Sequence, residues 1–237
     1  MPTSAYNSVL HRFTVFAAAC TFLLLIAGAL VTSNDAGLAV PDWPLSYGSI
    51  APPMVGGIFY EHAHRVAATF VGLLTIVLAV WFQRSEARRW VQRLGWVALG
   101  AVIAQGVLGG LTVLFYLPVS ISVAHATLAQ IFFGTLVSLA IFTSRWWQTA
   151  QAHAEDSGAP RAQALAVLTV AAIFLQLILG AAFRHKGFGI VPHLIGAAVV
   201  TVLIFWTATA LKRRYPLRAP ARLIQPPEQP AQLLLAI

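Results

Sequence analysis

Charged residues and cysteine are both scarce in this sequence. Only 9% of its 237 residues are Asp, Glu, Lys or Arg, whereas a soluble domain usually carries about 25%. A chain with so little charge cannot cover a water-exposed surface, which excludes an ordinary soluble enzyme and a disordered chain. The single cysteine, Cys20, excludes an internal disulfide and therefore a disulfide-built scaffold. What is present instead is apolar, at 59% of the residues, and this composition indicates a polytopic membrane protein.

Six long apolar runs stand out along the chain. A bilayer core about 30 Å thick is crossed by roughly 20 residues of helix. Because backbone groups in lipid must be hydrogen-bonded within their own segment, each run predicts a helix. The predicted fold class is therefore all-α, a polytopic membrane helix bundle with six transmembrane helices. The runs are 13–31, 66–82, 94–116, 119–142, 163–183 and 190–211.

The positive charges are concentrated in alternate connections between these runs. The net charge is +8, and the 15 basic residues all lie in one set of connections except Arg65, Arg184 and Lys186. The positive-inside rule then predicts that the N-terminus lies in the cytoplasm and that the long connection 32–60 lies outside. The charge is thus a topology signal, and we expect no nucleic-acid partner, because no basic domain is present to bind one.

A hairpin pattern occurs three times. The first, third and fifth helices each end in a pair of small residues, and the helix after each of them begins with a histidine. Small residues allow membrane helices to approach closely, and repeats in membrane proteins commonly place functional sites at their interface. The pairs are Gly28-Ala29, Gly109-Gly110 and Gly180-Ala181, and the histidines are His64, His125 and His193.

The three histidines are candidate ligands of a metal-containing cofactor. Ionisable side chains in membrane spans are costly and usually face the bundle interior. A single histidine is explained by hydrogen-bonded packing, but three at one depth favour ligation. Zinc or copper would need Cys, Met or carboxylate ligands nearby, whereas heme needs axial imidazoles in apolar surroundings. His64 and His125 begin parallel helices and are expected to bind one heme iron, with His193 in a second site.

Glu61 lies three residues before His64, on the same face of the predicted helix. Two interpretations stay open: the carboxylate pairs with Arg65 at the helix N-terminus, or it serves as an acid or base beside a substrate. Arg65 is a candidate partner of a heme propionate. Arg184 and His185 are further candidates for propionate contact, although an ordinary loop role for His185 is an equal alternative.

Aromatic residues of the first outer connection have two interpretations. Trp43 and Tyr47 fit an interfacial aromatic belt, and a role in covering a substrate is the alternative.

Several segments together carry a family resemblance. Segments 28–32 and 36–45, the motif Glu61-x-x-His64-Arg65, and the histidines His125 and His193 with their flanking residues resemble the heme A synthase family (CtaA type). The resemblance covers essentially the whole chain. Some family members carry a cysteine pair in the first outer loop. This sequence differs from them, because its first outer loop has no cysteine. Thiol chemistry in catalysis is therefore excluded.

The resemblance implies a function and an architecture. The family has eight helices in two similar halves, each half holding heme between two histidines. It oxidises the C8 methyl of heme O to the formyl group of heme A, for cytochrome oxidase assembly. This implies that His64 and His125 are axial ligands in the N-terminal half, that Glu61 is catalytic, and that His193 ligates a heme b. The cofactor-binding set then also contains Arg65, Arg184 and His185.

Two other functions stay open at this stage. The first is a non-catalytic heme-binding protein for electron transfer or oxidase assembly. The second is a small transporter whose histidines relay protons.

The expected organisation is a complete half followed by an incomplete one. We predict an N-terminal four-helix half at 1–147, a cytoplasmic linker at 148–161 and an incomplete C-terminal half at 162–237. Because 231–237 resembles the beginning of a seventh helix, we interpret the sequence as truncated after the sixth, with a natural six-helix variant as the alternative.

The resemblance also implies a location and partners. The expected location is a bacterial-type inner (plasma) membrane. The expected partners are the lipid bilayer, the substrate heme O, heme O synthase and cytochrome oxidase assembly factors. A homo-oligomer stays open.

Overall fold

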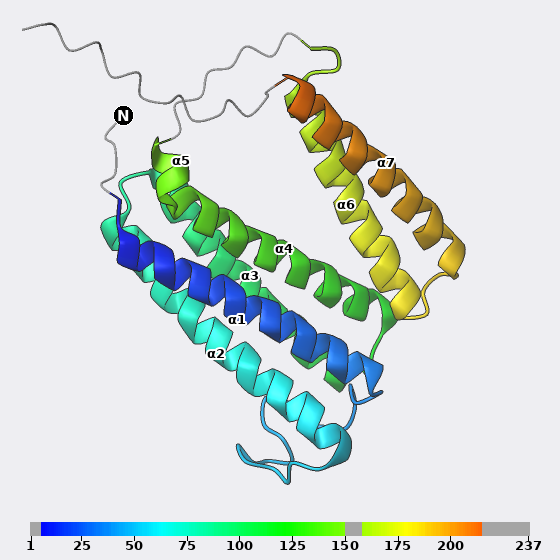
Figure 1. The fold of residues 1–237 in the computed structure, drawn as a ribbon. Helices are drawn as coiled ribbons and strands as arrows, with labels where there is room; N and C mark the ends of the chain where they lie inside the picture. The colour runs from blue at the N-terminus through cyan, green and yellow to red at the C-terminus, as the bar shows by residue number, and fades with distance from the viewer. Residues whose placement is uncertain (1–5, 150–157, 215–237) are drawn as a thin grey trace, which may run out of the picture.

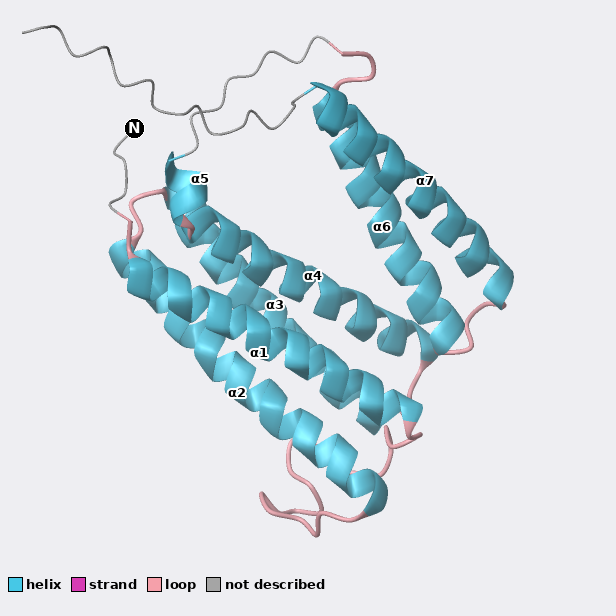
Figure 2. Ribbon diagram, viewed as in Figure 1, coloured by secondary structure: helices cyan, strands magenta, loops and turns pink. Residues whose placement is uncertain are grey.

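The computed structural model describes residues 6–149 and 158–214, and in these residues the regular structure is helical apart from an isolated bridge between Ser46 and Ser49 (Figure 2). Six of the helices are long and apolar enough to cross a membrane. The prediction of an all-α polytopic membrane protein is therefore confirmed. The six are α1 Ser8–Ser33, α2 Gly56–Ser85, α3 Arg89–Leu114, α4 Val119–Thr143, α6 Ala162–Arg184 and α7 Ile190–Arg214, and a short helix α5 spans Arg145–Thr149.

Helix α2 differs most from its apolar run. It begins at Gly56, ten residues before the run 66–82, so His64 lies in its third turn and Glu61 in its second. The polar segment 60–65 is helical because its side chains find partners in the preceding loop, as described below. Hydropathy alone therefore placed the beginning of this helix too late.

Local hydrogen bonds explain how polar residues fit into these helices. The Asn7 side chain accepts from the backbone N–H of Leu10 at 3.0 Å and caps α1. Buried threonines donate to the carbonyl four residues earlier, as Thr14 does to Leu10 and Thr75 does to Val71, at 2.7 and 2.8 Å. Their hydroxyls are thereby satisfied within the segment, as burial in lipid requires.

Helices α1 to α4 form a four-helix bundle (Figure 1). Each helix packs against its two neighbours in the cycle α1–α2–α3–α4–α1, so α2 and α4 lie at opposite corners. We call the end with the connections 34–55 and 115–118 the loop end, and the end with the α2–α3 turn at 86–88 the basic end. The main cluster of buried hydrophobic residues lies in the half of the bundle toward the basic end, at 10–18, 71–82, 91–98 and 132–139.

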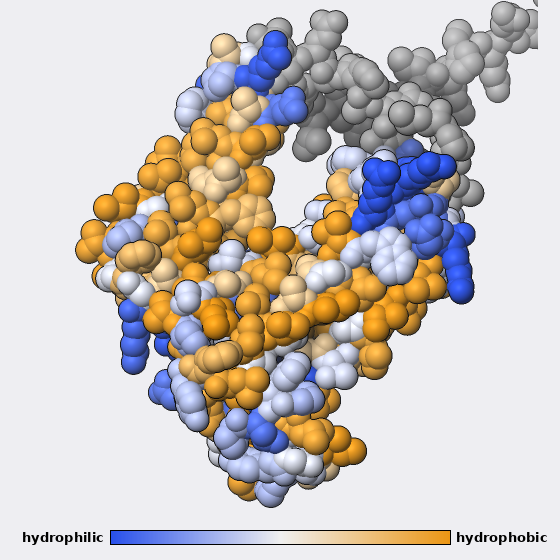
Figure 3. Space-filling view, turned by 180° about the vertical axis from the view of Figure 1, so that it is seen from behind, coloured by the Kyte–Doolittle hydropathy of each residue, from blue (hydrophilic) through white to orange (hydrophobic). Residues whose placement is uncertain are grey.

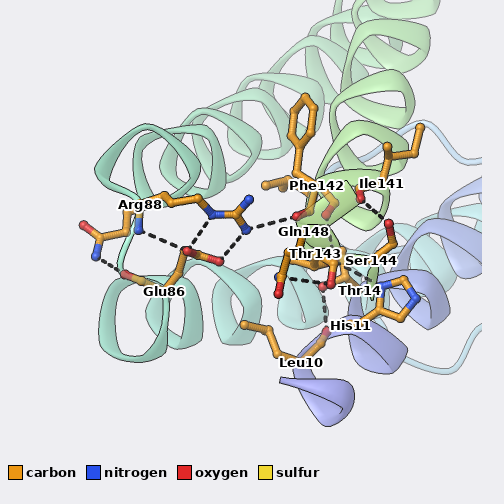
Figure 4. A network of polar contacts seen from close by, with 12 residues as sticks. Leu10, His11, Thr14, Glu86, Arg88, Ile141, Phe142, Thr143, Ser144 and Gln148 are labelled. Carbon is orange, nitrogen blue, oxygen red and sulfur yellow. Dashed lines mark hydrogen bonds and ion pairs between the residues drawn. The ribbon is translucent and has the colours of Figure 1, made fainter. Parts of the chain in front are cut away.

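Polar contacts close the basic end (Figure 4). Glu86 is only 5% exposed and accepts from Arg88 Nε and Nη2, both at 2.8 Å. Arg88 Nη2 also donates to the carbonyl of Phe142 in α4, at 3.0 Å. His11 of α1 and Thr143 of α4 are joined by a hydrogen bond of 3.2 Å. This network ties α1 and the α2–α3 turn to the end of α4.

Helices α6 and α7 form a separate hairpin that meets the bundle through α6 and α4. The hairpin lies against the bundle near the loop end and diverges from it toward the other end (Figure 1). Arg184 Nη2 donates to the carbonyl of Thr32 at the end of α1, at 2.8 Å, and Gly187 lies next to Val119 at the start of α4.

The surface fits a lipid environment. Apolar residues cover the helices, and hydrophilic residues gather toward the ends (Figure 3). The division at 1–147, 148–161 and 162–237 stays a prediction. Most of the predicted linker, 150–157, and the predicted start of a seventh helix, 231–237, lie outside the described residues.

Candidate functional site

Each predicted glycine–histidine pair is in contact. A Cβ atom at Gly28 would lie 3.1 Å from Cε1 of His64, and one at Gly109 would lie 3.2 Å from Cε1 of His125. In the third hairpin, a Cβ at Gly180 would lie 3.0 Å from Cε1 of His193. Each imidazole therefore lies directly on the glycine of the preceding helix, in a space that a larger residue would fill. The three-fold hairpin pattern read from the sequence is present in space.

His64 and His125 belong to the two opposite corners of the bundle, α2 and α4. Their Nδ1 atoms are buried and have no hydrogen-bond partner. The two rings are close enough to interact electrostatically. Both lie toward the loop end, outside the half that the hydrophobic core fills. The bundle thus brings together two buried imidazoles with unused nitrogen atoms.

His193 lies apart from this pair, in the α6–α7 hairpin. Its ring stacks on Phe183 with 6.2 Å between centroids and an interplanar angle of 10°. Gln176 Nε2 lies 2.9 Å from His193 Nδ1 and donates to the His193 carbonyl, also at 2.9 Å. This imidazole therefore has a side-chain partner that the other two lack.

Glu61 and Arg65 hold the loop that precedes their helix. Glu61 is 4% exposed, and its Oε2 accepts from the backbone N–H of Val40 at 2.8 Å. Its Oε1 accepts from Arg65 Nη2 at 2.5 Å. Arg65 Nη1 donates to the carbonyls of Asp42 and Leu45, at 2.7 and 2.6 Å. Of the two interpretations of Glu61, its pairing with Arg65 is therefore present, and the pair binds the loop to α2.

The same loop covers the loop end of the bundle. A Cβ at Gly110 would lie 2.7 Å from Cδ2 of Trp43, so the indole lies on α3 beside the glycine that contacts His125. The Asp42 carboxylate accepts from the backbone N–H of Gly48 and of Tyr47, and these bonds hold the Asp42 pKa below its usual value. From the sequence, a covering role for Trp43 is only the alternative to a place in the aromatic belt. Gly110, the second glycine of the Gly109-Gly110 pair, is the sequence feature that indicates this role of Trp43.

Arg184 and His185 lie where the hairpin meets the bundle. Arg184 is bonded to the α1 carbonyl of Thr32. His185 ends α6, and burial, followed by the charge of Arg184, lowers its pKa. His185 also interacts electrostatically with His125. Arg184 therefore connects the hairpin to the bundle, and His185 lies near His125 of α4.

An apolar groove lies on another side of α2. Its volume is about 590 Å³, and His62 at its edge is joined to Ser46 Oγ by a hydrogen bond of 2.8 Å. The other lining residues come from the loop and from the following turns of α2, and they include Ile50, Met54, Val66 and Phe70. His62 and His64 thus lie on different faces of α2, as expected for residues two positions apart in a helix.

Comparison with known proteins identifies relatives. A family model described as "COX15-CtaA: Cytochrome oxidase assembly protein" matches residues 54–192, a range that contains His64 and His125. The chain is 32% identical over 139 residues to the heme A synthase of Lysinibacillus sphaericus (strain C3-41). This match covers 57% of this chain and 45% of that protein. It is 33% identical over 146 residues to the heme A synthase of Geobacillus thermodenitrificans, covering 61% and 46%. The chain thus spans about half the length of the curated relatives it matches. No solved structure matches it with significance.

Proposed function

The chain belongs to the COX15-CtaA family of cytochrome oxidase assembly proteins, and from this premise we propose that it is a membrane oxidoreductase of the heme A synthase type. The proposed reaction is oxidation of the C8 methyl of heme O to the formyl group of heme A. The observation that carries the proposal is the pair of buried imidazoles, His64 and His125, whose Nδ1 atoms have no partner. Because the matches cover less than half of each relative, the activity of the whole protein is a proposal.

The residues of the loop-end half fit a heme. Axial ligation of heme iron uses imidazole, and two imidazoles approach each other here from opposite corners of the bundle. The glycines under the rings leave room for the imidazoles and for nothing larger. The hydrophobic core fills the other half of the bundle, so binding a large apolar ring does not require the core to be displaced. When bound, the heme supplies the oxidation–reduction chemistry.

The first loop keeps water from this half. Trp43 lies on Gly110 and closes the bundle beside His125. Arg65 holds the loop in this position through the carbonyls of Asp42 and Leu45. Exclusion of water strengthens the electrostatic interactions within a site and protects reactive intermediates.

We assign the role at the reacting methyl to Glu61, as the family resemblance implies. The Val40 N–H and Arg65 hold its carboxylate in a fixed orientation. Since both oxygens are engaged, proton transfer by Glu61 requires one of these bonds to open. The same engagement favours the second candidate function, a heme-binding protein for electron transfer or oxidase assembly, in which Glu61 only anchors the loop.

The remaining candidates complete the proposal. His193 is proposed as an axial ligand of a heme b in the C-terminal part. Arg65, Arg184 and His185 are proposed to contact heme propionates. The proposed setting is a bacterial-type inner membrane with the N-terminus in the cytoplasm. Heme O synthase and oxidase assembly factors are the proposed partners.

The test is pigment analysis of the full-length protein, expressed together with a heme O synthase. We expect bound heme and the accumulation of heme A. Bound heme without heme A would favour the second candidate function, and a colourless protein would contradict both.

Two variants separate the roles of the residues. His64→Ala is expected to lose the heme of the N-terminal half. Glu61→Gln keeps the side-chain shape and an acceptor for the Val40 N–H, so we expect heme to stay bound while heme A formation falls at least about tenfold. Normal heme A formation by Glu61→Gln would remove Glu61 from the chemistry.

A further inference from the structure

The residue four positions before each hairpin glycine lies against the histidine of the same hairpin. In the first two hairpins its backbone carbonyl lies beside the imidazole, outside hydrogen-bonding geometry. In the third hairpin its side chain binds the imidazole. The position therefore lies beside the imidazole in all three repeats. The residues at this position are Leu24, Gln105 and Gln176.

Gln176 shows what a glutamine does at this position. Its amide nitrogen lies 2.9 Å from His193 Nδ1 and 2.9 Å from the His193 carbonyl. One amide thereby holds both the ring and the backbone of the histidine. Its own Oε1 is buried and has no partner.

Gln105 has the same place in the second hairpin. Its Oε1 is buried without a partner, and so is Nδ1 of His125. Gly109 lies one turn further along α3 and contacts the His125 ring, as Gly180 contacts the His193 ring. In the second hairpin, Oε1 of Gln105 and Nδ1 of His125 are thus both unpaired, although the one can accept and the other can donate a hydrogen bond. In the third hairpin, the corresponding glutamine and histidine are bonded to each other.

The chemistry of ligation determines which amide atom is needed at Nδ1. An imidazole binds iron through Nε2 only when its proton is on Nδ1, and ligating histidines usually donate that N–H to an oxygen. An amide carries one acceptor and one donor end, and rotation about its Cγ–Cδ bond exchanges Nε2 for Oε1 at the ring. In Gln176 this rotation exchanges the bond from Nε2 to the His193 carbonyl for a bond from Nδ1–H to Oε1. The unpartnered Oε1 atoms of Gln105 and Gln176 are therefore acceptors for an Nδ1–H.

We propose that Gln105 and Gln176 are positioning residues for His125 and His193, each accepting the Nδ1–H of its imidazole through Oε1 and leaving Nε2 for heme iron. The inference rests on the proposed function, because it requires heme at these histidines. In the first hairpin Leu24 occupies the place, so His64 has only a backbone carbonyl beside its ring. The two imidazoles of the N-terminal site consequently differ: His125 has an amide partner and His64 has none.

The test compares variants of the full-length protein loaded with heme. Gln105→Leu removes the acceptor, and we expect heme to dissociate about tenfold to a hundredfold faster, the usual effect of losing such a partner. We also expect a higher midpoint potential, since the imidazole becomes a weaker electron donor. Gln105→Glu can only accept when ionised, so it should retain heme and lower the potential. Gln83→Leu is the matched control, because Gln83 lies in α2 and bonds Trp96 instead.

The outcomes separate this inference from the proposed function. Equal heme dissociation and potential in Gln105→Leu and Gln83→Leu would overturn the inference and leave heme binding intact. A wild-type protein without a Soret band would overturn both. If Gln105→Leu does not fold, Gln105→Glu decides the question. Retained heme with a lowered potential supports the inference, and a folded Glu variant without heme overturns it. Gln176→Leu repeats the comparison for the third hairpin.

Discussion

At the scale of single residues, the glycine under each histidine decides where the imidazole lies. The contacts at Gly28, Gly109 and Gly180 all leave only about 3 Å between a hypothetical Cβ and the ring. Other glycines of α3, the helix of Gly109, have open space at that position, namely Gly100 and Gly106. The role of a glycine in this protein thus depends on the residue across from it, and helix propensity alone does not explain the pairs.

Gly109→Ala and Gly106→Ala test this contact. Both changes remove a glycine from α3, a gain of up to about 1 kcal/mol in helix propensity. Only Gly109→Ala adds a methyl group 3.2 Å from the His125 ring. We expect Gly106→Ala to keep the wild-type heme spectrum, and Gly109→Ala to shift it and weaken heme binding about tenfold. Absorption spectra and heme titration of the two purified proteins measure this, and identical behaviour would contradict the contact.

At the scale of elements, the two ends of the bundle are closed in different ways. At the loop end, a long connection folds over the helices and is held by Glu61 and Arg65. At the basic end, the short α2–α3 turn carries its own ion pair, Glu86 and Arg88, and reaches α4 through the Phe142 carbonyl (Figure 4). The basic end belongs to the packed core, whereas the loop end contains the histidines. We infer that stability and function occupy opposite ends of the bundle.

The ion pair at the basic end predicts a pH-dependent stability. Burial raises the pKa of Glu86, but the hydrogen bonds and charge of Arg88 outweigh it, so the pKa lies below its usual 4.5. The stabilisation is therefore complete above pH 4.5 and is lost as the pH falls through the folded pKa. We expect Arg88→Ala to lower the free energy of unfolding by roughly 2 kcal/mol at neutral pH and by less in acid.

Unfolding in detergent at a series of pH values measures the difference. Arg89→Ala, which changes the exposed arginine at the start of α3, is the control and should change stability little. An effect of Arg88→Ala that does not diminish in acid would show that its bond to Phe142, and not the Glu86 pair, provides the stability.

At the scale of the whole molecule, the bundle and the hairpin join near the loop end. Arg184 bonds the end of α1, and His185 lies within electrostatic range of His125. The three glycine–histidine contacts therefore all lie toward one side of the membrane. By the positive-inside rule, we expect that side to be the outer one.

Thiol labelling tests this orientation. In a Cys20→Ala background, we expect Ile50→Cys to react with a membrane-impermeant reagent in intact cells, because Ile50 is 83% exposed at the loop end. Ala87→Cys, in the exposed turn of the basic end, should react only after the cells are permeabilised. The reverse pattern would place the N-terminus outside.

Part of this architecture could be predicted from the sequence and part could not. The six helices and the pairing of small residues with histidines follow from hydropathy and spacing, which are local properties. The early start of α2 does not, because its polar turn is stabilised by Val40, Asp42 and Leu45, which precede it by about twenty residues. Likewise, the contact of Trp43 with Gly110 joins distant segments.

The sequence by itself determined the membrane class, the six spans found in the described residues, the family and the candidate histidines. Composition, periodicity and motifs carry this information, because lipid requires long apolar helices and close helix contacts require glycine. Only the tertiary structure decided that Glu61 and Arg65 bind the loop and that the main hydrophobic cluster lies in the half away from the histidines. It also decided that Gln176 reaches His193. Each of these depends on which atoms meet across helices, and that follows from packing in three dimensions.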